Sequence, residues 1–198
     1  MQRSHMLVSM VLALLLCVTT VGWAFDGERQ GFILGVGVGA GLTSYTQTIS
    51  DGGFSVTGDR ENPFGIMSDF KIGYAPSDVI EIYWMSKVSW FSLENALGDD
   101  VTIANGIGGL GVTYFFQSTA PSAFVSGGIG FSSWTAPFEE GAEAWYGIGV
   151  SAGAGYEFSP HWYLEGNVCW GKPSTEEYGV DFSTNSLSFK VTLNVIGY

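Results

Sequence analysis

The sequence is poor in basic residues, proline and long apolar runs. Seven Lys and Arg stand against 19 Asp and Glu in 198 residues, which gives a net charge of −12. This balance argues against nucleic acid as a partner, because its phosphates attract basic proteins. Charged residues make up only 13% and there are six Pro, a composition unlike that of disordered chains. Beyond the first 24 residues no stretch reaches the roughly 18 uninterrupted apolar residues of a transmembrane helix.

The first 24 residues have the features of a secretion signal. Arg3 precedes an apolar run at 6–18, and the small residues Gly22 and Ala24 occupy the −3 and −1 positions of a cleavage site. We therefore predict a cleaved signal peptide at 1–24.

The mature chain is predicted to be one domain, 25–198, with a single cysteine. Cys17 falls within the signal, and Leu16 stands where a lipoprotein signal has a small residue, which argues against lipidation. Cys169 then has no partner for an internal disulfide, and a buried position is expected for it.

Glycine is abundant instead, at 29 residues, and it alternates with apolar side chains. Successive side chains of a strand point to opposite faces, so this pattern predicts strands with one apolar and one small or polar face. We predict eight strands, at 31–45, 63–75, 79–92, 102–116, 122–134, 143–158, 162–171 and 185–198. Long connections (47–62, 93–101, 135–142, 172–184) alternate with short ones (76–78, 117–121, 159–161). This alternation is typical of an all-β, antiparallel up-and-down transmembrane barrel with both termini in the periplasm.

The aromatic residues of the apolar face fall into two groups, one near the short turns and one near the long loops. Such girdles mark the two membrane interfaces of an outer-membrane barrel. The predicted girdle residues are Phe64, Tyr74, Trp90, Tyr114, Phe116, Phe131, Tyr146, Tyr156, Phe158, Trp162 and Trp170. The alternative is a soluble ligand-binding barrel, in which the apolar face would line the cavity instead.

The chain resembles the OmpA-like and OmpX-like family of small outer-membrane barrels. The resemblance rests on the signal, the eight strands, the aromatic C-terminus and the opening Gly31-Phe-Ile-Leu-Gly-Val-Gly-Val-Gly-Ala-Gly41. The resemblance covers essentially the whole mature chain. It implies an integral location in the outer membrane of a Gram-negative-type cell, contact with lipid and lipopolysaccharide, and insertion by the barrel-assembly machinery. One departure is Tyr198, which lies on the inward parity where the family signal has an outward aromatic. A bulge near Gly197 would restore the parity.

Seven charged residues are predicted to face the lumen: Asp69, Lys71, Glu81, Lys87, Glu157, Glu165 and Lys190. Across the first short turn Lys71 is expected diagonal to Glu81 and Asp69 diagonal to Lys87. Lys190 is the expected partner of Glu165. The network could form a proton or ion relay, or a gate. We favour a structural network that fills a narrow lumen, because unpaired charges there would be costly.

Motifs for catalysis or cofactors are weak. Residues 106–111 match G-x-G-x-x-G, but a strand continues after them where a phosphate-binding helix would have to begin. His161 is the one mature histidine, and it lies in a predicted periplasmic turn, so no Ser-His-acid or metal cluster can be assembled in the outer leaflet. We expect no enzyme, no cofactor and no bound metal.

The predicted long loops carry most of the acidic residues. These are Asp51, Asp59, Glu61, Glu94, Asp99, Asp100, Glu139, Glu140, Glu143, Glu176, Glu177 and Asp181, against Arg60 and Lys172. They could bind divalent cations or a basic surface, or serve only as a solvated rim. The leading hypothesis is a non-enzymatic outer-membrane protein with a structural or surface-interaction role. The runner-up is a narrow pore, and a lipid A-modifying enzyme comes third.

Overall fold

The computed structural model describes residues 28–94 and 98–198. The predicted signal at 1–24 lies outside the described residues. No helix of the described chain is long and apolar enough to cross a membrane. Nine strands form: β1 (Gly31–Asp51), β2 (Phe54–Thr57), β3 (Phe64–Ser77), β4 (Ile80–Glu94), β5 (Asp100–Phe115), β6 (Ser122–Thr135), β7 (Trp145–Ser159), β8 (Trp162–Glu177) and β9 (Val180–Gly197).

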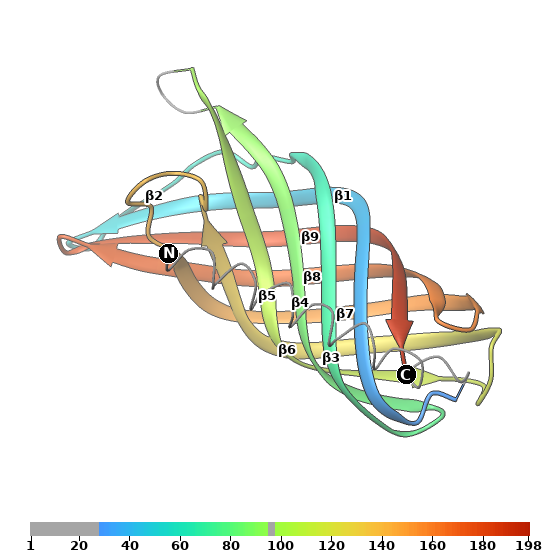
Figure 1. The fold of residues 1–198 in the computed structure, drawn as a ribbon. Helices are drawn as coiled ribbons and strands as arrows, with labels where there is room; N and C mark the ends of the chain where they lie inside the picture. Colours follow the sequence, from blue (N-terminus) through green and yellow to red (C-terminus); the bar gives the residue numbers. More distant parts are fainter. Residues whose placement is uncertain (1–27, 95–97) are drawn as a thin grey trace, which may run out of the picture.

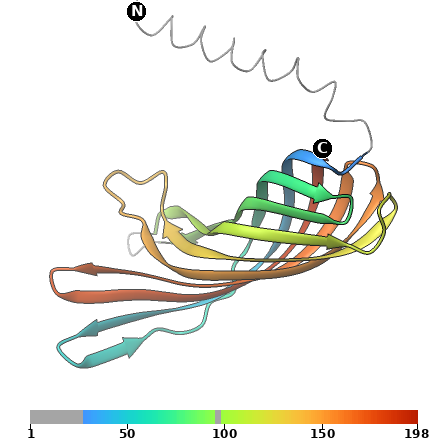
Figure 2. The same cartoon turned by 90° about the horizontal axis from the view of Figure 1, so that it is seen from below.

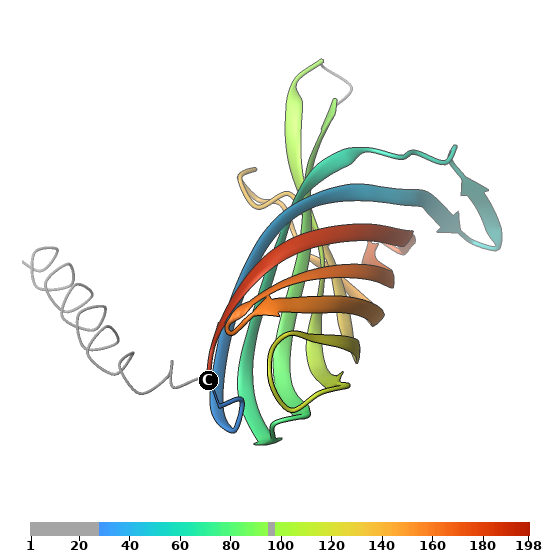
Figure 3. The same cartoon turned by 90° about the vertical axis from the view of Figure 1, so that its right-hand side faces the viewer.

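Eight of these strands form a closed ring (Figure 1). Each of β1 and β3 to β9 pairs antiparallel with its neighbours, and β1 pairs with β9 from Leu34↔Gly197 to Ser50↔Asp181. The first strand therefore begins beside the C-terminus (Figure 3). Closure leaves no unpaired sheet edge at membrane depth. The predicted eight-stranded up-and-down barrel is confirmed.

The apolar side chains lie on the outside of this ring. In β1 the outward Phe32 and Val38 are 58% and 62% exposed, whereas the inward Ile33 and Thr43 are fully buried. The outward face turns polar after Leu42, with Ser44 and the threonines and serine that follow it. The apolar band is thus limited in height, as a bilayer requires, and the soluble barrel with an apolar cavity is excluded.

Three strands run further than predicted beyond that band. The predicted loop at 172–184 is wrong, because β8 and β9 continue through it to a two-residue turn at Tyr178-Gly179. β1 likewise extends to Asp51 and returns through Gly52-Gly53 into β2. Both turns have positive φ at both residues, as type I′ hairpins require. Outside lipid both faces of these hairpins are in contact with water, so the regular alternation of apolar and polar residues that predicts a strand disappears. The hairpins project beyond the barrel in Figure 2.

Inward glycines leave room for large side chains that fill the lumen. A Cβ on Gly111 would lie 2.4 Å from the ring of Tyr83, and one on Gly128 would lie 2.3 Å from the Cε of Met85. Tyr83 and Met85 are both buried. Glycine on one strand therefore accommodates a large residue from another, and the barrel interior is packed with side chains.

Candidate functional site in the barrel lumen

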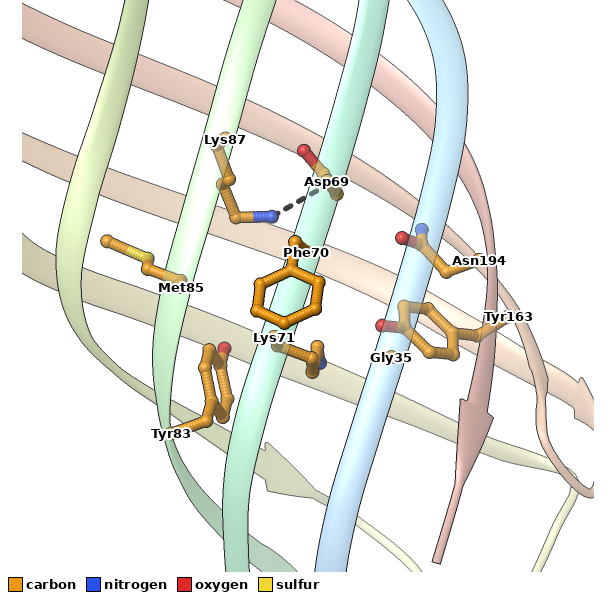
Figure 4. Close-up of a pocket in the computed structure, with 9 residues that line it drawn as sticks. All are labelled: Gly35, Asp69, Phe70, Lys71, Tyr83, Met85, Lys87, Tyr163 and Asn194. Atoms are coloured by element: carbon orange, nitrogen blue, oxygen red, sulfur yellow. Dashed lines mark hydrogen bonds and ion pairs between the residues drawn. The ribbon is translucent and has the colours of Figure 1, made fainter. Parts of the chain in front are cut away.

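Lys87 lies at the centre of the lumen. Its Nζ is 3.0 Å from Asp69 Oδ2 and 3.2 Å from Glu165 Oε2 (Figure 4 shows the first contact). Asp69 is directly opposite Lys87 in the β3–β4 register, closer than the diagonal position predicted. Glu165 lies on β8, which is four strands from β4 in either direction around the ring. The Lys87–Glu165 pair therefore crosses the full width of the barrel.

A second ion pair lies nearer the short turns. Lys71 Nζ is 3.2 Å from Glu81 Oε2, so the predicted pair forms. Lys71 is opposite Met85, however, which places Glu81 two residues beyond the predicted diagonal position. The same ammonium lies 4.5 Å and 4.9 Å from the ring centroids of Tyr83 and Tyr163, within range of cation–π attraction. A cavity of about 10 Å³ lies between the two ion pairs, which is about the space that one water needs (Figure 4).

The end of the lumen beside the short turns is closed by Arg29, which sequence reasoning missed. Its Nε and Nη2 donate to Glu157 Oε2, and Nη1 donates to the carbonyl oxygens of Asp78 (2.9 Å) and Gln117 (2.7 Å). Tyr198 OH donates to the other oxygen of Glu157 at 3.1 Å. Arg29 thus joins two turns, β7 and the C-terminus.

A count of charges could have identified Arg29. The predicted network had four carboxylates and three lysines, so one inward carboxylate lacked a cation. Arg29 was the one mature cation assigned neither to the lumen nor to a loop. Arg29 lies before the first strand, where there is no alternating pattern to show whether a side chain points into the lumen or outward.

The predicted Lys190–Glu165 pair is wrong. Glu165 accepts from Lys87 at 3.2 Å and from Ser126 Oγ at 2.5 Å. Within the described chain, Lys190 Nζ and both side-chain polar atoms of Asn167 have no hydrogen-bond partner, although both residues are buried. Cys169 is buried, as predicted. Pairing on adjacent strands was the basis of the prediction, but a lysine from the opposite wall reaches Glu165 instead.

Aromatic side chains close the other end of the lumen. Trp134 lies 4.8 Å from Tyr45 and 5.7 Å from Phe91, measured between ring centroids, and Ile103 completes the cluster. Tyr45 OH donates to Glu61 Oε2 at 2.6 Å. Tyr45 lies above the apolar band, and burial together with the Glu61 carboxylate raises the pKa of its hydroxyl. The hydroxyl is therefore held in its neutral, donating form. Tyr45 is inward by parity, but the predicted strand ended at this residue, and the cluster was missed.

The predicted girdle residues lie on the outer wall. Nine of them are exposed, and the indoles of Trp90 and Trp170 are partly covered. Each of these two indoles donates its N–H to the barrel surface, Trp90 to Ser68 Oγ at 2.8 Å and Trp170 to Asn185 Oδ1 at 2.9 Å. In each case the polar N–H of the indole has a hydrogen-bond acceptor while the apolar part of the ring faces outward, as is typical of tryptophans at a membrane interface.

His161 lies in the turn between β7 and β8 with positive φ. Its Nδ1 is 3.0 Å from the carbonyl oxygen of Ile196, and its ring lies against Tyr198. In the described part of the chain, no group of His, Cys, Asp and Glu is placed to hold a metal ion.

Fold and lumen together define a closed eight-stranded antiparallel barrel with an apolar outer wall and a filled interior. No known protein-family model matches the chain, and no curated protein matches it in sequence. Among solved structures it is similar to the outer membrane protein OprG from Pseudomonas aeruginosa, with a TM-score of 0.50 and 12% identity over 86% of this chain and 97% of that chain. The outer membrane protein AlkL gives 0.49 and 15% (86% and 92% covered), and Neisserial surface protein A gives 0.48 and 13% (83% and 96%). The chain has the fold of small outer-membrane barrel proteins.

Proposed function

We propose that this protein is an integral outer-membrane barrel with a closed lumen, without enzymatic activity, which contacts basic partners at the cell surface through its projecting hairpins. One observation carries the proposal. The strands within the apolar band surround a lumen filled by paired side chains, and the same strands continue beyond the band as acidic hairpins.

The placement in the membrane is supported by β9 as well as β1. The outward residues of β9 are apolar from Leu187 to Val195, whereas Asn185, Ser183 and Asp181 before them are polar. The change occurs beside the same change in β1, since Leu187 pairs with Ser44. A bilayer would cover the apolar part, and water would surround the hairpins.

A closed lumen is supported at three levels. Arg29 and Glu157 block the end beside the short turns, Lys87 and Glu165 join opposite walls at the centre, and the Tyr45 cluster fills the other end. A solute could pass only after several buried ion pairs had separated. This arrangement favours the structural role of the charged network over the pore, which is the runner-up.

Surface interaction is supported by the four-stranded sheet that β2, β1, β9 and β8 form beyond the band. Val56, Ile49 and Phe182 lie side by side across three of its strands. Val56 is 71% exposed, and Asp51, two residues beyond Ile49, lies on the same face of the sheet. Asp181 is next to Phe182 in the chain and therefore points to the opposite face. An apolar row with carboxylates on both faces of the same sheet fits a partner with apolar and basic side chains.

The closed lumen predicts that the purified barrel does not conduct ions. After detergent extraction, the folded state is checked by a shift in gel migration on boiling, and single-channel current is then recorded in planar bilayers. We expect no discrete conductance steps from the wild-type protein. Steps whose size changes in Lys87→Ala would establish the pore and contradict the closed barrel.

The surface role predicts electrostatic adhesion. Cells displaying the wild-type protein should bind polylysine-coated beads and not polyglutamate-coated beads, and binding should fall as salt shortens the Debye length from about 10 Å at 0.1 M to about 3 Å at 1 M. The triple change Glu176→Gln, Glu177→Gln and Asp181→Asn should lower bead binding about tenfold. The matched control is Glu139→Gln with Glu140→Gln in a different connection, which should have a smaller effect. If the triple variant bound as many polylysine-coated beads as the wild type, the projecting hairpins would not be the surface that contacts basic partners.

A further inference from the structure

The outer wall over β7, β8, β9 and β1 contains an open groove within the apolar band. Ala154, Gly166, Val191 and Ala40 lie side by side across these four strands. Three of the four are Gly or Ala, whereas larger residues such as Phe189 flank the row. A Cβ added to Gly166 would meet no atom closer than 3.8 Å, so the barrel itself does not fill the groove.

Both exposed cations of the described chain lie beyond this groove on the side of the hairpins, because Lys172 is four residues past Val168 of the groove and Arg60 contacts Ser44, two residues past Leu42 of the groove. Of its six Lys and Arg, four are buried in the lumen, which leaves Arg60 and Lys172. Lys172 follows Trp170 on the outward face of β8 and is paired with the outward Ile148 of β7. Arg60 Nη1 donates to Ser44 Oγ at 3.0 Å, and Ser44 is the first outward polar residue of β1 above the band.

The two cations lie on the same side of the barrel. Ser44 pairs with Leu187, and Leu187 pairs with Trp170, so the Arg60 contact and the Trp170–Lys172 segment are two strand spacings apart. The backbones at Ser44 and Trp170 are therefore about 10 Å apart, and Lys172 lies two residues, about 7 Å, further along β8. One large phosphorylated headgroup can bridge such a distance. Everywhere else above the band the exposed charges are acidic. An anionic headgroup would therefore be repelled elsewhere and attracted here.

We infer that this face binds lipopolysaccharide, with its phosphates at Arg60 and Lys172 and an acyl chain in the groove beside Gly166. The inference rests on the proposed location in the outer membrane, with the hairpins outside. A guanidinium forms strong paired hydrogen bonds with phosphate, and a lysine ammonium serves as a compact point charge beside it. The indole of Trp170, held by Asn185, lies at the height where acyl chains meet the headgroup.

The inference is tested with the refolded full barrel in phosphatidylcholine nanodiscs, after the gel shift on boiling has shown that each variant is folded. Purified rough lipopolysaccharide is titrated and bound lipid is counted by native mass spectrometry. Reversing both charges, Arg60→Glu with Lys172→Glu, should weaken binding at least about 30-fold, because loss of two cations at an anionic lipid surface has that effect and the new carboxylates add repulsion. Gly166→Leu fills the groove and should weaken binding about tenfold, as the loss of two buried methylene contacts would.

Gly127→Leu is the matched control for the groove. Gly127 also faces outward, on β6, and its added Cβ would meet no atom closer than 3.6 Å, but no exposed cation lies above it. We expect this variant to bind lipopolysaccharide with wild-type affinity. We also expect the wild-type protein to bind phosphatidylglycerol and dephosphorylated lipopolysaccharide at least tenfold more weakly than intact lipopolysaccharide. Three outcomes would each overturn the inference. The charge-reversed variant could bind lipopolysaccharide as tightly as the wild type does, or the wild type could bind phosphatidylglycerol as tightly as lipopolysaccharide. Gly127→Leu and Gly166→Leu could also lose the same amount of lipopolysaccharide affinity. A barrel that shows no gel shift on boiling would instead count against the proposed function.

Discussion

Replacing Lys87 with methionine is expected to lower the free energy of unfolding by about 3–5 kcal/mol, the usual cost of removing one partner from a buried ion pair. Two carboxylates, Asp69 and Glu165, would lose their ammonium together, and both are buried. The change is measured from urea unfolding curves of the refolded barrel, with gel migration as the readout of folded protein.

Lys190→Met is the matched control, because Lys190 is a lysine of the same lumen that is equally buried. Its Nζ has no hydrogen-bond partner among the described residues, so its removal should cost much less than the loss of Lys87. Neutralising the acids as well, in Lys87→Met with Asp69→Asn and Glu165→Gln, should recover most of the lost stability. If Lys87→Met and Lys190→Met cost the same, the central ion pairs do not stabilise the barrel in the way that the geometry indicates.

Replacing Arg29 with alanine is the second change with a large expected effect, also about 3–5 kcal/mol. The Glu157 carboxylate would remain buried without its cation, and the carbonyl oxygens of Asp78 and Gln117 would lose a donor. Because Arg29 lies outside the strands, a loss of this size would show that residues before β1 help to hold the barrel closed. The same urea assay measures it.

A double-mutant cycle separates the pair from the rest of the contacts. Glu157→Gln made in the Arg29→Ala background should recover part of the loss, since the buried charge is then gone. Gln30→Ala serves as the control next in sequence, because its amide makes only an exposed contact with Asp78 at 3.0 Å, and surface changes are usually within about 0.5 kcal/mol. A loss in Gln30→Ala as large as that in Arg29→Ala would point to general disturbance of the N-terminal segment.

Tyr198 lies inside the end of the barrel and not on its outer wall. β9 ends at Gly197 without a bulge that would turn the last residue outward, and Tyr198 is buried against Glu157. The bulge near Gly197 that would turn Tyr198 outward is therefore absent, and Tyr198 keeps the inward position that its parity predicts. The last two outward residues of β9 are Val195 and Gly197, and neither is aromatic.

The sequence by itself determined the architecture and the two faces of the wall. Alternation is a local property, since each side chain of a strand points opposite to the next, and lipid outside with a narrow lumen inside makes it visible in most of the membrane-spanning strands. The first half of β5 is the exception, because seven consecutive residues there are buried. For the same reason the sequence assigned Asp69, Lys87 and Glu165 to the lumen correctly. It missed the ends of β1, β8 and β9, where water on both faces removes the contrast.

The sequence also predicted the Lys71–Glu81 and Asp69–Lys87 ion pairs of adjacent strands, and only the tertiary structure decided the remaining ones. The sequence argument paired residues on adjacent strands, whereas Lys87 reaches Glu165 from the opposite wall and Arg29 enters the lumen from outside the strands. The grouping of Arg60 and Lys172 above one groove likewise joins residues 112 positions apart in the chain. Such neighbours depend on ring closure, strand tilt and register, which are properties of the whole barrel and leave no periodic trace in any one segment.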